Sequence, residues 1–247
     1  MWKVPLFRIF QDDEDVKRVS DVIRRGEQWA LGPEIKEFED EVKKYVGSKY
    51  CVAFNSGTSA LHSVLLACRI KEGAKIAVPS FSFIASANCA LFVGARPVFV
   101  DIEEERLSMD PAHLSSVLSR EKIDAVIPVH YAGGPCRIEE ILEETKSKEG
   151  AIVIEDAAES FGSTIRGKMT GTFGRAGVLS FAPNKVITTG EGGAVITDSQ
   201  EIYERLLLAR SHGRQDVAGT YFTSTESADY VDLGYNFRMP SMVAALG

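Results

Sequence analysis

At 247 residues, with 45% hydrophobic and 26% charged residues, the chain is long enough for one substantial globular core. Its 28 Lys and Arg against 35 Asp and Glu give a net charge of −7, which disfavours electrostatic binding to nucleic acid or to acidic lipid surfaces. The first residues lack the apolar segment of a signal peptide, and no stretch approaches the ~18 apolar residues needed to span a bilayer. We therefore expect a cytoplasmic protein.

The first predicted elements are two helices. One spans Asp13 to Arg25, with valines and an isoleucine on one face, and the other begins at Pro33 and closes near Gly47. Proline suits the first turn of a helix and glycine its C-terminal cap, so both ends of the second helix are marked.

From Tyr50 onward, short apolar runs alternate with stretches of helical periodicity, which indicates a largely parallel sheet with helices on both faces. After Asp156, the apolar runs 177–181 and 194–197 are joined by a stretch too short for a helical crossover, so antiparallel pairing is possible there. We expect a mixed, mostly parallel sheet. The predicted strands before Asp156 cover 51–54, 75–78, 97–101, 125–130 and 151–155, and the predicted helices cover 59–69, 82–93, 111–118 and 137–146.

Beyond the last strand, the pattern predicts a helix over 200–211 and then an extended loop or flap over 213–229, which is rich in Ser, Thr and Gly. The chain stops at Gly247, just as 240–247 begins to read as another helix, without a cap or a polar tail. This ending predicts a truncated chain.

Cysteine and histidine are scattered without C-x-x-C or metal-ligand spacing, and each cysteine lies in an apolar or helical context. We expect reduced thiols and no structural metal. The residues are Cys51, Cys68, Cys89, Cys136, His62, His113, His130 and His212.

A candidate anion site lies at Asn55-Ser-Gly-Thr-Ser-Ala-Leu61, which follows a predicted strand and opens a helix. The amides of Thr58 and Ser59 can point at a phosphate in the positive field of the helix N-terminus. The motif alone is weak, and a helix cap is its simpler explanation. Ser180, which can face the same phosphate, strengthens the functional interpretation.

Two carboxylates, Glu155 and Asp156, end an apolar strand, and pleat alternation sends their side chains to opposite faces. Ligands of open α/β sheets gather beyond the carboxyl ends of the strands, where a carboxylate can keep a pyridine nitrogen protonated. We assign this role to Asp156. A helix-capping aspartate is the alternative, and it is disfavoured only by the residues that follow.

Lys185 lies in Ser180-Phe-Ala-Pro-Asn-Lys185, shortly before the glycine run 190–193. A serine five positions before the lysine can face a phosphate, and the glycines allow backbone to approach a flat ring. Together with Asp156, these features indicate a lysine that binds the aldehyde of pyridoxal phosphate. Phe83, in Pro79-Ser-Phe-Ser-Phe83, is the candidate ring that lies against the cofactor, although an aromatic residue at a strand end is more often core.

These motifs, together with Glu155-Asp-Ala-Ala-Glu-Ser160 and Gly234-Tyr-Asn-Phe-Arg-Met239, occur in an order that resembles the DegT/DnrJ/EryC1/StrS family of sugar aminotransferases. The resemblance covers nearly the whole chain. It implies the aspartate aminotransferase-like large domain of fold type I pyridoxal phosphate transferases over 1–247, with the N-terminal helices included. Family members continue into a smaller C-terminal domain, which we expect to be absent here.

The resemblance also implies roles for individual residues. Lys185 and Asp156 are the catalytic residues, and Lys185 serves both as covalent anchor and as general base. Glu159 stands where the family often has Gln or His near the ring. Asn236 would reach the phosphate bound by the neighbouring subunit of a homodimer. The residues expected to bind the cofactor are Gly57, Thr58, Ser59, Phe83, Asp156, Glu159, Ser180, Lys185 and Asn236.

The implied reaction transfers an amino group from an amino acid, by resemblance glutamate, to a keto group of a nucleotide-linked sugar, with pyridoxal phosphate as cofactor. A sugar dehydratase of the same family is one alternative, but that branch has histidine at the position of Lys185. A non-catalytic, regulatory homologue that binds pyridoxal phosphate is the other. No helix-turn-helix pattern or basic stripe supports DNA binding.

Overall fold

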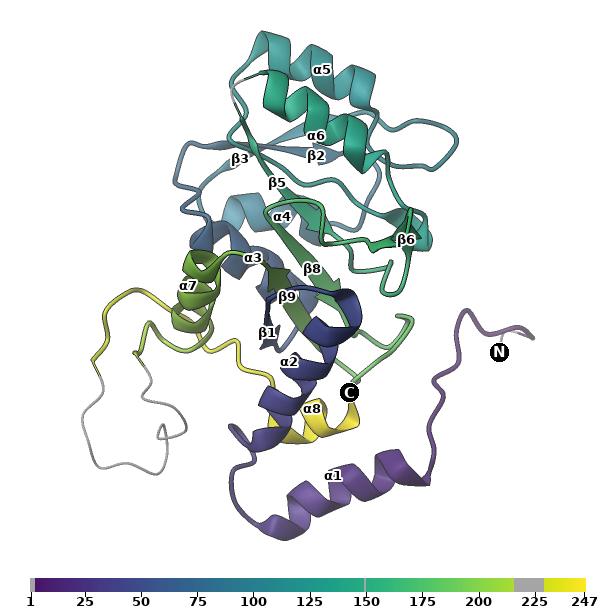
Figure 1. Cartoon of the computed structure of the whole chain (residues 1–247), viewed down its shortest axis with the longest axis vertical. Coiled ribbons are helices and arrows are strands. Elements are labelled where there is room, and N and C mark those ends of the chain that lie inside the picture. Colours follow the sequence, from purple (N-terminus) through teal and green to yellow (C-terminus); the bar gives the residue numbers. More distant parts are fainter. Residues whose placement is uncertain (1–2, 149, 216–228) are drawn as a thin grey trace.

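The computed structural model describes residues 3–148, 150–215 and 229–247, which form a sheet enclosed between two layers of helices (Figure 1). The sheet has seven strands. They are β1 (Tyr50–Phe54), β2 (Lys75–Pro79), β3 (Arg96–Val100), β4 (Ala125–Val126), β5 (Ile152–Asp156), β8 (Ala176–Ser180) and β9 (Gly193–Thr197). Their order across the sheet is β1-β9-β8-β5-β4-β2-β3.

Helices cover both faces of the sheet. One face packs against α3 (Gly57–Ala67), α4 (Ala85–Phe92) and α7 (Gln200–Arg210), and the other against α2 (Pro33–Val46), α5 (Pro111–Arg120) and α6 (Ile138–Ser147). α1 (Asp13–Arg25) and α8 (Ser241–Leu246) pack together below α2 (Figure 1). The short elements are η1 (Tyr131–Gly133) and the hairpin of β6 (Thr164–Ile165) and β7 (Lys168–Met169).

The strand directions confirm the predicted mixed, mostly parallel sheet. Strands β3, β2, β4, β5 and β8 pair in parallel, whereas β9 is antiparallel to both β8 and β1. β8 and β9 correspond to the two apolar runs for which antiparallel pairing was possible. The connection between them, residues 181–192, contains no helix, which agrees with the antiparallel direction because a parallel crossover usually runs through a helix.

One predicted strand is shorter than expected. The run 125–130 pairs as a regular strand only over Ala125–Val126, although Val129 still forms an isolated bridge with Asp156. Pro128 interrupts the ladder because proline has no amide hydrogen to donate. The chain beyond β4 is therefore irregular, and it leads into η1 beside the candidate site.

The core follows the pleat of the strands. In β1, Val52 and Phe54 pack in the cluster beneath α3, whereas Cys51 and Ala53 pack in the cluster beneath α2. All four side chains are buried, as expected for a strand covered on both faces. Burial of large apolar side chains of this kind contributes about 1.5–3 kcal/mol each.

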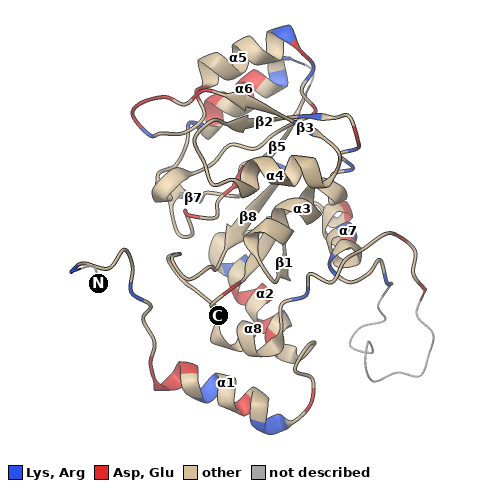
Figure 2. Ribbon diagram, turned by 180° about the vertical axis from the view of Figure 1, so that it is seen from behind, with Lys and Arg blue, Asp and Glu red and all other residues tan. Residues whose placement is uncertain are grey.

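The two signs of charge alternate along α1, which has acidic residues in its first turn and basic residues in its last (Figure 2). This arrangement complements the helix dipole. Helices in the described part of the chain are all too short or too polar to span a lipid bilayer. All four cysteines have free thiols. The predicted flap over 213–229 falls almost entirely on 216–228, which lie outside the described residues.

A buried ion pair joins α2 to α7 and β1. Glu39 Oε1 accepts hydrogen bonds from the Ala53 amide at 2.8 Å and from Arg210 Nη1 at 2.6 Å, and Arg210 Nη1 also donates to the Ala53 carbonyl. Glu39→Ala is expected to lower the free energy of unfolding by about 3–5 kcal/mol, because it leaves Arg210 and the Ala53 amide without their carboxylate. Urea denaturation measures this loss.

The control for that substitution is Glu37→Ala, which removes an exposed carboxylate from the same helix. This variant should stay within about 0.5 kcal/mol of the wild type. Equal losses in the two variants would mean that helix propensity, and not the buried pair, accounts for the effect of Glu39.

Candidate active site

The candidate residues gather at one edge of the sheet. Asp156 ends β5 and Ser180 ends β8, while the antiparallel strand β9 begins at Gly193 beside both Ser180 and Phe54. The carboxyl ends of β1, β5 and β8 therefore meet the amino end of β9. In open α/β sheets, this is the edge at which ligands bind.

Lys185 lies after β8, with its ammonium group against Glu159. Lys185 Nζ donates to Glu159 Oε1 at 3.0 Å, and the side chains are 15% and 31% exposed. The other carboxylate oxygen of Glu159 accepts the Ala132 amide at 2.8 Å. Burial alone would raise the pKa of the Glu159 carboxyl, but the Ala132 amide and Lys185 together lower it. Glu159 thus holds the predicted nucleophile in place.

Asp156 is buried at the floor of the same region. Its Oδ2 accepts from Ser86 Oγ at 2.7 Å, and its Oδ1 accepts the Ala158 amide at 3.2 Å. Burial raises the pKa of the Asp156 carboxyl, whereas these hydrogen bonds and the charge of Lys185 partly oppose the rise. Because Asp156 ends β5 at the ligand-binding edge of the sheet, it is suited to pair with a cationic group that binds at that edge.

Glu155 points away from Asp156, as pleat alternation predicted. Its carboxylate accepts the amides of Gly171, Phe173 and Gly174 and lies 2.9 Å from His130 Nε2. The Cys136 amide donates to His130 Nδ1, so Nε2 carries the hydrogen that faces Glu155. This buried network fixes the backbone that leads into β8 but leaves no oxygen for a ligand.

The predicted anion site is the N-terminus of α3. The helix begins at Gly57, two residues before the predicted start, because Ser56 caps it by accepting the Ser59 amide at 3.1 Å. The Ser59 hydroxyl donates to Asn55 Oδ1 at 2.5 Å. Since the first amides of a helix have no partner within it, those of Gly57 and Thr58 can bind an anion. The Ser59 side chain instead holds the turn in shape.

Two close backbone approaches shape this anion site. A Cβ added at Gly57 would lie 3.1 Å from Ser180 Cβ and 3.2 Å from Ser180 Oγ, so Ser180 stands directly over the helix N-terminus. A Cβ at Gly193 would collide with the carbonyl group of Ser56. Glycine at both positions therefore brings β8 and β9 against the start of α3. This packing forms a cradle of amides and one hydroxyl.

Gly57→Ala is expected to weaken binding of pyridoxal phosphate by about tenfold or more, because the added methyl group displaces Ser180 and costs a charge-assisted hydrogen bond. Titration of the cofactor absorbance measures the affinity. Phosphate-free pyridoxal is the control ligand, and its affinity should change less. A similar loss for both ligands would show that the cradle does not recognise phosphate.

Phe83 lies at the rim of the site, just before α4, the helix that supplies Ser86. Its ring is 73% exposed, so it is not part of the core. Phe81 is less exposed and packs on Tyr131, with 4.8 Å between the ring centroids. The open face of Phe83 makes it the better candidate for stacking on a planar ligand.

Asn236 lies beside the cradle. It forms an isolated bridge with Ser211, and the next carbonyl, that of Phe237, accepts the Asn55 amide at 2.9 Å. The neighbouring rings of Tyr235 and Phe237 stack on each other and pack against His62. The Asn236 side chain is exposed. Its contact with the phosphate bound by a second subunit stays a prediction.

Two residues that the sequence did not single out complete the site. Ser86 supplies a hydroxyl to Asp156 from seventy positions away, and Ala132 supplies an amide to Glu159 from a left-handed backbone conformation with φ 51°. Proximity of the Ser80–Ser86 stretch to the same sheet edge was the only sequence signal for Ser86. No sequence pattern identifies a backbone amide such as that of Ala132 as part of a site. Within the described ranges, no cluster of three His, Cys, Asp or Glu side chains could hold a metal ion.

Comparisons with known proteins agree with this geometry. The chain is 38% identical over 218 residues to GDP-perosamine synthase from Caulobacter vibrioides, covering 88% of the chain and 56% of that protein. The structure of an aminotransferase from Psychrobacter cryohalolentis matches with a TM-score of 0.90 and 31% identity, covering 98% of the chain and 62% of that one. The structure of the GDP-4-keto-6-deoxy-D-mannose-3-dehydratase of E. coli with bound hydrated pyridoxal phosphate matches with a TM-score of 0.88 and 30% identity. The match covers 98% of the chain and 66% of that protein.

The chain spans less than two thirds of the length of each of these relatives. The structural matches confirm the predicted α/β fold of the pyridoxal phosphate aminotransferases. The model of the DegT/DnrJ/EryC1/StrS aminotransferase family matches residues 10–247, and the motifs described above lie within that range. The chain belongs to the DegT/DnrJ/EryC1/StrS aminotransferase family.

Proposed function

We propose that this chain carries the cofactor-binding machinery of a pyridoxal phosphate-dependent aminotransferase. The reaction moves an amino group from an amino acid, glutamate by family resemblance, to a keto group of a nucleotide-linked sugar in amino-sugar or polysaccharide biosynthesis. The observation that carries the proposal is the meeting of an amine, a buried carboxylate and an anion cradle at one sheet edge. Similarity to a GDP-perosamine synthase supports the class of sugar substrate.

The residues present fit a phosphorylated pyridine aldehyde. Gly57, Thr58 and Ser180 form a cradle that suits the phosphate. Gly57 has no side chain, so the space in front of Ser180, which a Cβ at Gly57 would occupy, stays open. Asp156 is buried and hydrogen-bonded, so it suits a protonated ring nitrogen. Phe83 leaves a ring face open above this floor. When bound, the cofactor supplies an aldehyde and an electron-withdrawing ring.

Each residue has a separate task in the proposed reaction. Lys185 would hold the cofactor through its amine and would move a proton at the substrate carbon as general base and acid, while the bound cofactor would supply the aldehyde. Glu159 orients the Lys185 amine through their 3.0 Å contact. Asp156 keeps its negative charge beside the ring nitrogen. Ser59 maintains the cradle through its bond to Asn55.

The complete site requires a second subunit in this proposal. Asn236 is exposed beside the cradle, where it is available to reach the phosphate bound by the partner of a homodimer. We assign the protein to the cytoplasm, where nucleotide-linked sugars and amino acid donors are both present.

The test is a spectrum of the purified protein with added pyridoxal phosphate. We expect a visible absorption band that borohydride removes, and peptide mass spectrometry should place the reduced adduct on Lys185. Glutamate should then shift the band, and a screen of keto-sugar nucleotides should identify the acceptor. A protein that stays colourless, with no reducible adduct, contradicts the proposal.

Two other functions correspond to distinct outcomes of the same test. A regulatory homologue would bind the cofactor covalently but show no spectral change with glutamate. A dehydratase, the activity named for the similar E. coli protein, would remove a hydroxyl group from the sugar without leaving an amino sugar. Lys185 opposes this alternative, because the dehydratase branch has histidine at that position.

A further inference from the structure

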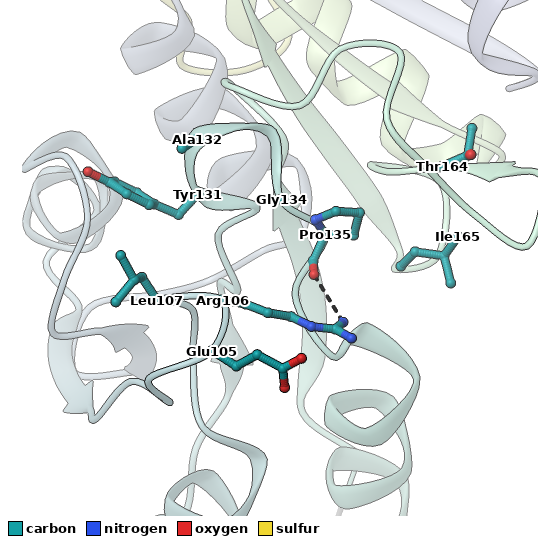
Figure 3. Close-up of a pocket in the computed structure, with 9 residues that line it drawn as sticks. All are labelled: Glu105, Arg106, Leu107, Tyr131, Ala132, Gly134, Pro135, Thr164 and Ile165. Carbon is teal, nitrogen blue, oxygen red and sulfur yellow. Dashed lines mark hydrogen bonds between the residues drawn. The ribbon is translucent and has the colours of Figure 1, made fainter.

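A cavity lies beside the candidate active site, between the loop that follows β3, the turn η1 and the hairpin strand β6 (Figure 3). Its volume is about 550 Å³, which is within the range of pockets that hold small molecules. The side chains that define it are Glu105, Arg106, Leu107, Tyr131, Pro135 and Ile165.

The cavity is connected to Lys185 by two hydrogen bonds. Ala132 lines the cavity, and its amide donates to Glu159 Oε2, while Glu159 Oε1 accepts from Lys185 Nζ. On the same side, the ring of Tyr131 packs on Phe81 at the end of β2. The cavity wall is therefore one residue away from Lys185, and a substrate whose reacting carbon lies at Lys185 would reach the cavity by extending past Glu159.

The walls of the cavity combine apolar surfaces with one polar edge. Leu107, Pro135 and Ile165 provide the apolar surfaces, and Arg106 lies across the cavity with Nη1 donating to the Pro135 carbonyl at 3.2 Å (Figure 3). Glu105 stands next to Arg106, so a hydrogen-bond acceptor and a donor lie side by side. A nucleobase has apolar faces and an edge with both donors and acceptors, which matches this arrangement.

The charges around the cavity favour a base over a diphosphate. Three consecutive glutamates, residues 103–105, precede Arg106, and an anionic group placed among them would be repelled. Glu105 pairs with Arg137 at 3.2 Å, but both side chains are more than a third exposed, and such a pair is weak enough to exchange for a ligand.

We propose that this cavity binds the nucleobase and ribose of the nucleotide-linked substrate, with Glu105 and Arg106 at the polar edge of the base. This inference rests on the function proposed above. The diphosphate would lie between the cavity and Lys185, outside the acidic loop. The cavity thus distinguishes nucleotide-linked sugars from free sugars, and its polar edge selects among bases.

Calorimetric titration of the cofactor-loaded protein with GDP, UDP and dTDP tests this assignment. At least one nucleoside diphosphate should bind the wild type. Glu105→Gln, Arg106→Gln and Thr164→Trp, which fills the cavity from its exposed wall, should each weaken that binding by about tenfold or more. Glu104→Gln is the matched control, since Glu104 has the same charge but is exposed and does not line the cavity. It should stay within twofold of the wild type.

Two results would overturn the assignment: failure of all three nucleotides to bind the wild type, or wild-type affinity in all three cavity variants. A loss that is equally large in Glu104→Gln would also overturn it, because general charge and not the cavity would then govern binding. Inorganic pyrophosphate serves as a probe of the diphosphate alone, and the cavity variants should not change its binding. The borohydride-reducible adduct at Lys185, measured on the same samples, reports separately on the proposed function.

Discussion

Lys185→Ala is expected to abolish transamination, with a loss of turnover of about 10⁴-fold or more. The substitution removes the amine that we propose to bind the cofactor aldehyde and to move the proton. The cradle at the start of α3 does not involve Lys185, so pyridoxal phosphate should still bind without a covalent link. The measurements are a donor-to-ketosugar assay and the spectrum after borohydride reduction, in which the adduct at residue 185 should be missing.

Lys185→Arg separates the chemistry of the amine from its charge. Arginine can keep the ion pair with Glu159 but cannot form the covalent bond, so this variant should be as inactive as the alanine variant. Both should fold, because the Lys185–Glu159 pair is partly exposed and contributes at most about 1 kcal/mol. A primary alkylamine added to the alanine variant should restore part of the activity. Full turnover by Lys185→Ala without added amine would refute the assignment.

Asp156→Asn is expected to lower turnover by about 10²–10³-fold, because a neutral amide of the same shape replaces the buried negative charge that we propose to pair with the ring nitrogen. Cofactor binding through the cradle should persist. The assay should therefore show a loss in kcat, accompanied by a shifted absorption band of the bound cofactor.

Ser86→Ala is the control for the loss of hydrogen bonding at Asp156. It removes the 2.7 Å bond to Oδ2 but keeps the carboxylate, so its effect on turnover should be clearly smaller than that of Asp156→Asn. If the serine variant were as inactive as the asparagine variant, orientation of Asp156 and not its charge would be the essential property.

The same aspartate should reduce the stability of the cofactor-free protein. Burial raises the pKa of Asp156, so the ionised form is less favourable in the folded chain than in the unfolded one. Above the raised pKa the folded state carries the whole penalty, and below the unfolded value of about 3.9 it carries none. Asp156→Asn should thus increase the free energy of unfolding at pH 7–8, by a margin that shrinks toward pH 4. Urea denaturation at several pH values checks this.

A margin that grew as the pH fell would contradict the assigned direction of the pKa shift. If the prediction holds, Asp156 is a residue at which stability is lost for function, since its hydrogen bonds and the charge of Lys185 offset the buried charge only in part.

The local signals in the sequence were sufficient for most of the elements and for choosing candidate site residues at one edge of the sheet. The continuous apolar run 152–154 placed Asp156 at the end of β5, and the alternation of side chains along a strand turned Glu155 to the opposite side. Gly57 and the serines around the start of α3 indicated the anion cradle. The motif 180–185, which precedes the glycine run 190–193, indicated Lys185. These signals are readable because they depend on the periodicity of one strand or the cap of one helix.

Tertiary structure alone decided which distant groups meet. The hydroxyl of Ser86 reaches Asp156, and the amide of Ala132 fixes Glu159 against Lys185, although no local pattern pairs these positions. The cavity at Glu105 and Arg106 likewise needs three separate segments, the loop after β3, the turn η1 and the strand β6, to come together. The sequence by itself determined which residue types stand at the ends of the strands. The order of the strands across the sheet and the hydrogen bonds between distant segments decided which of them share a site, because such contacts depend on the packing of the whole chain and not on local periodicity.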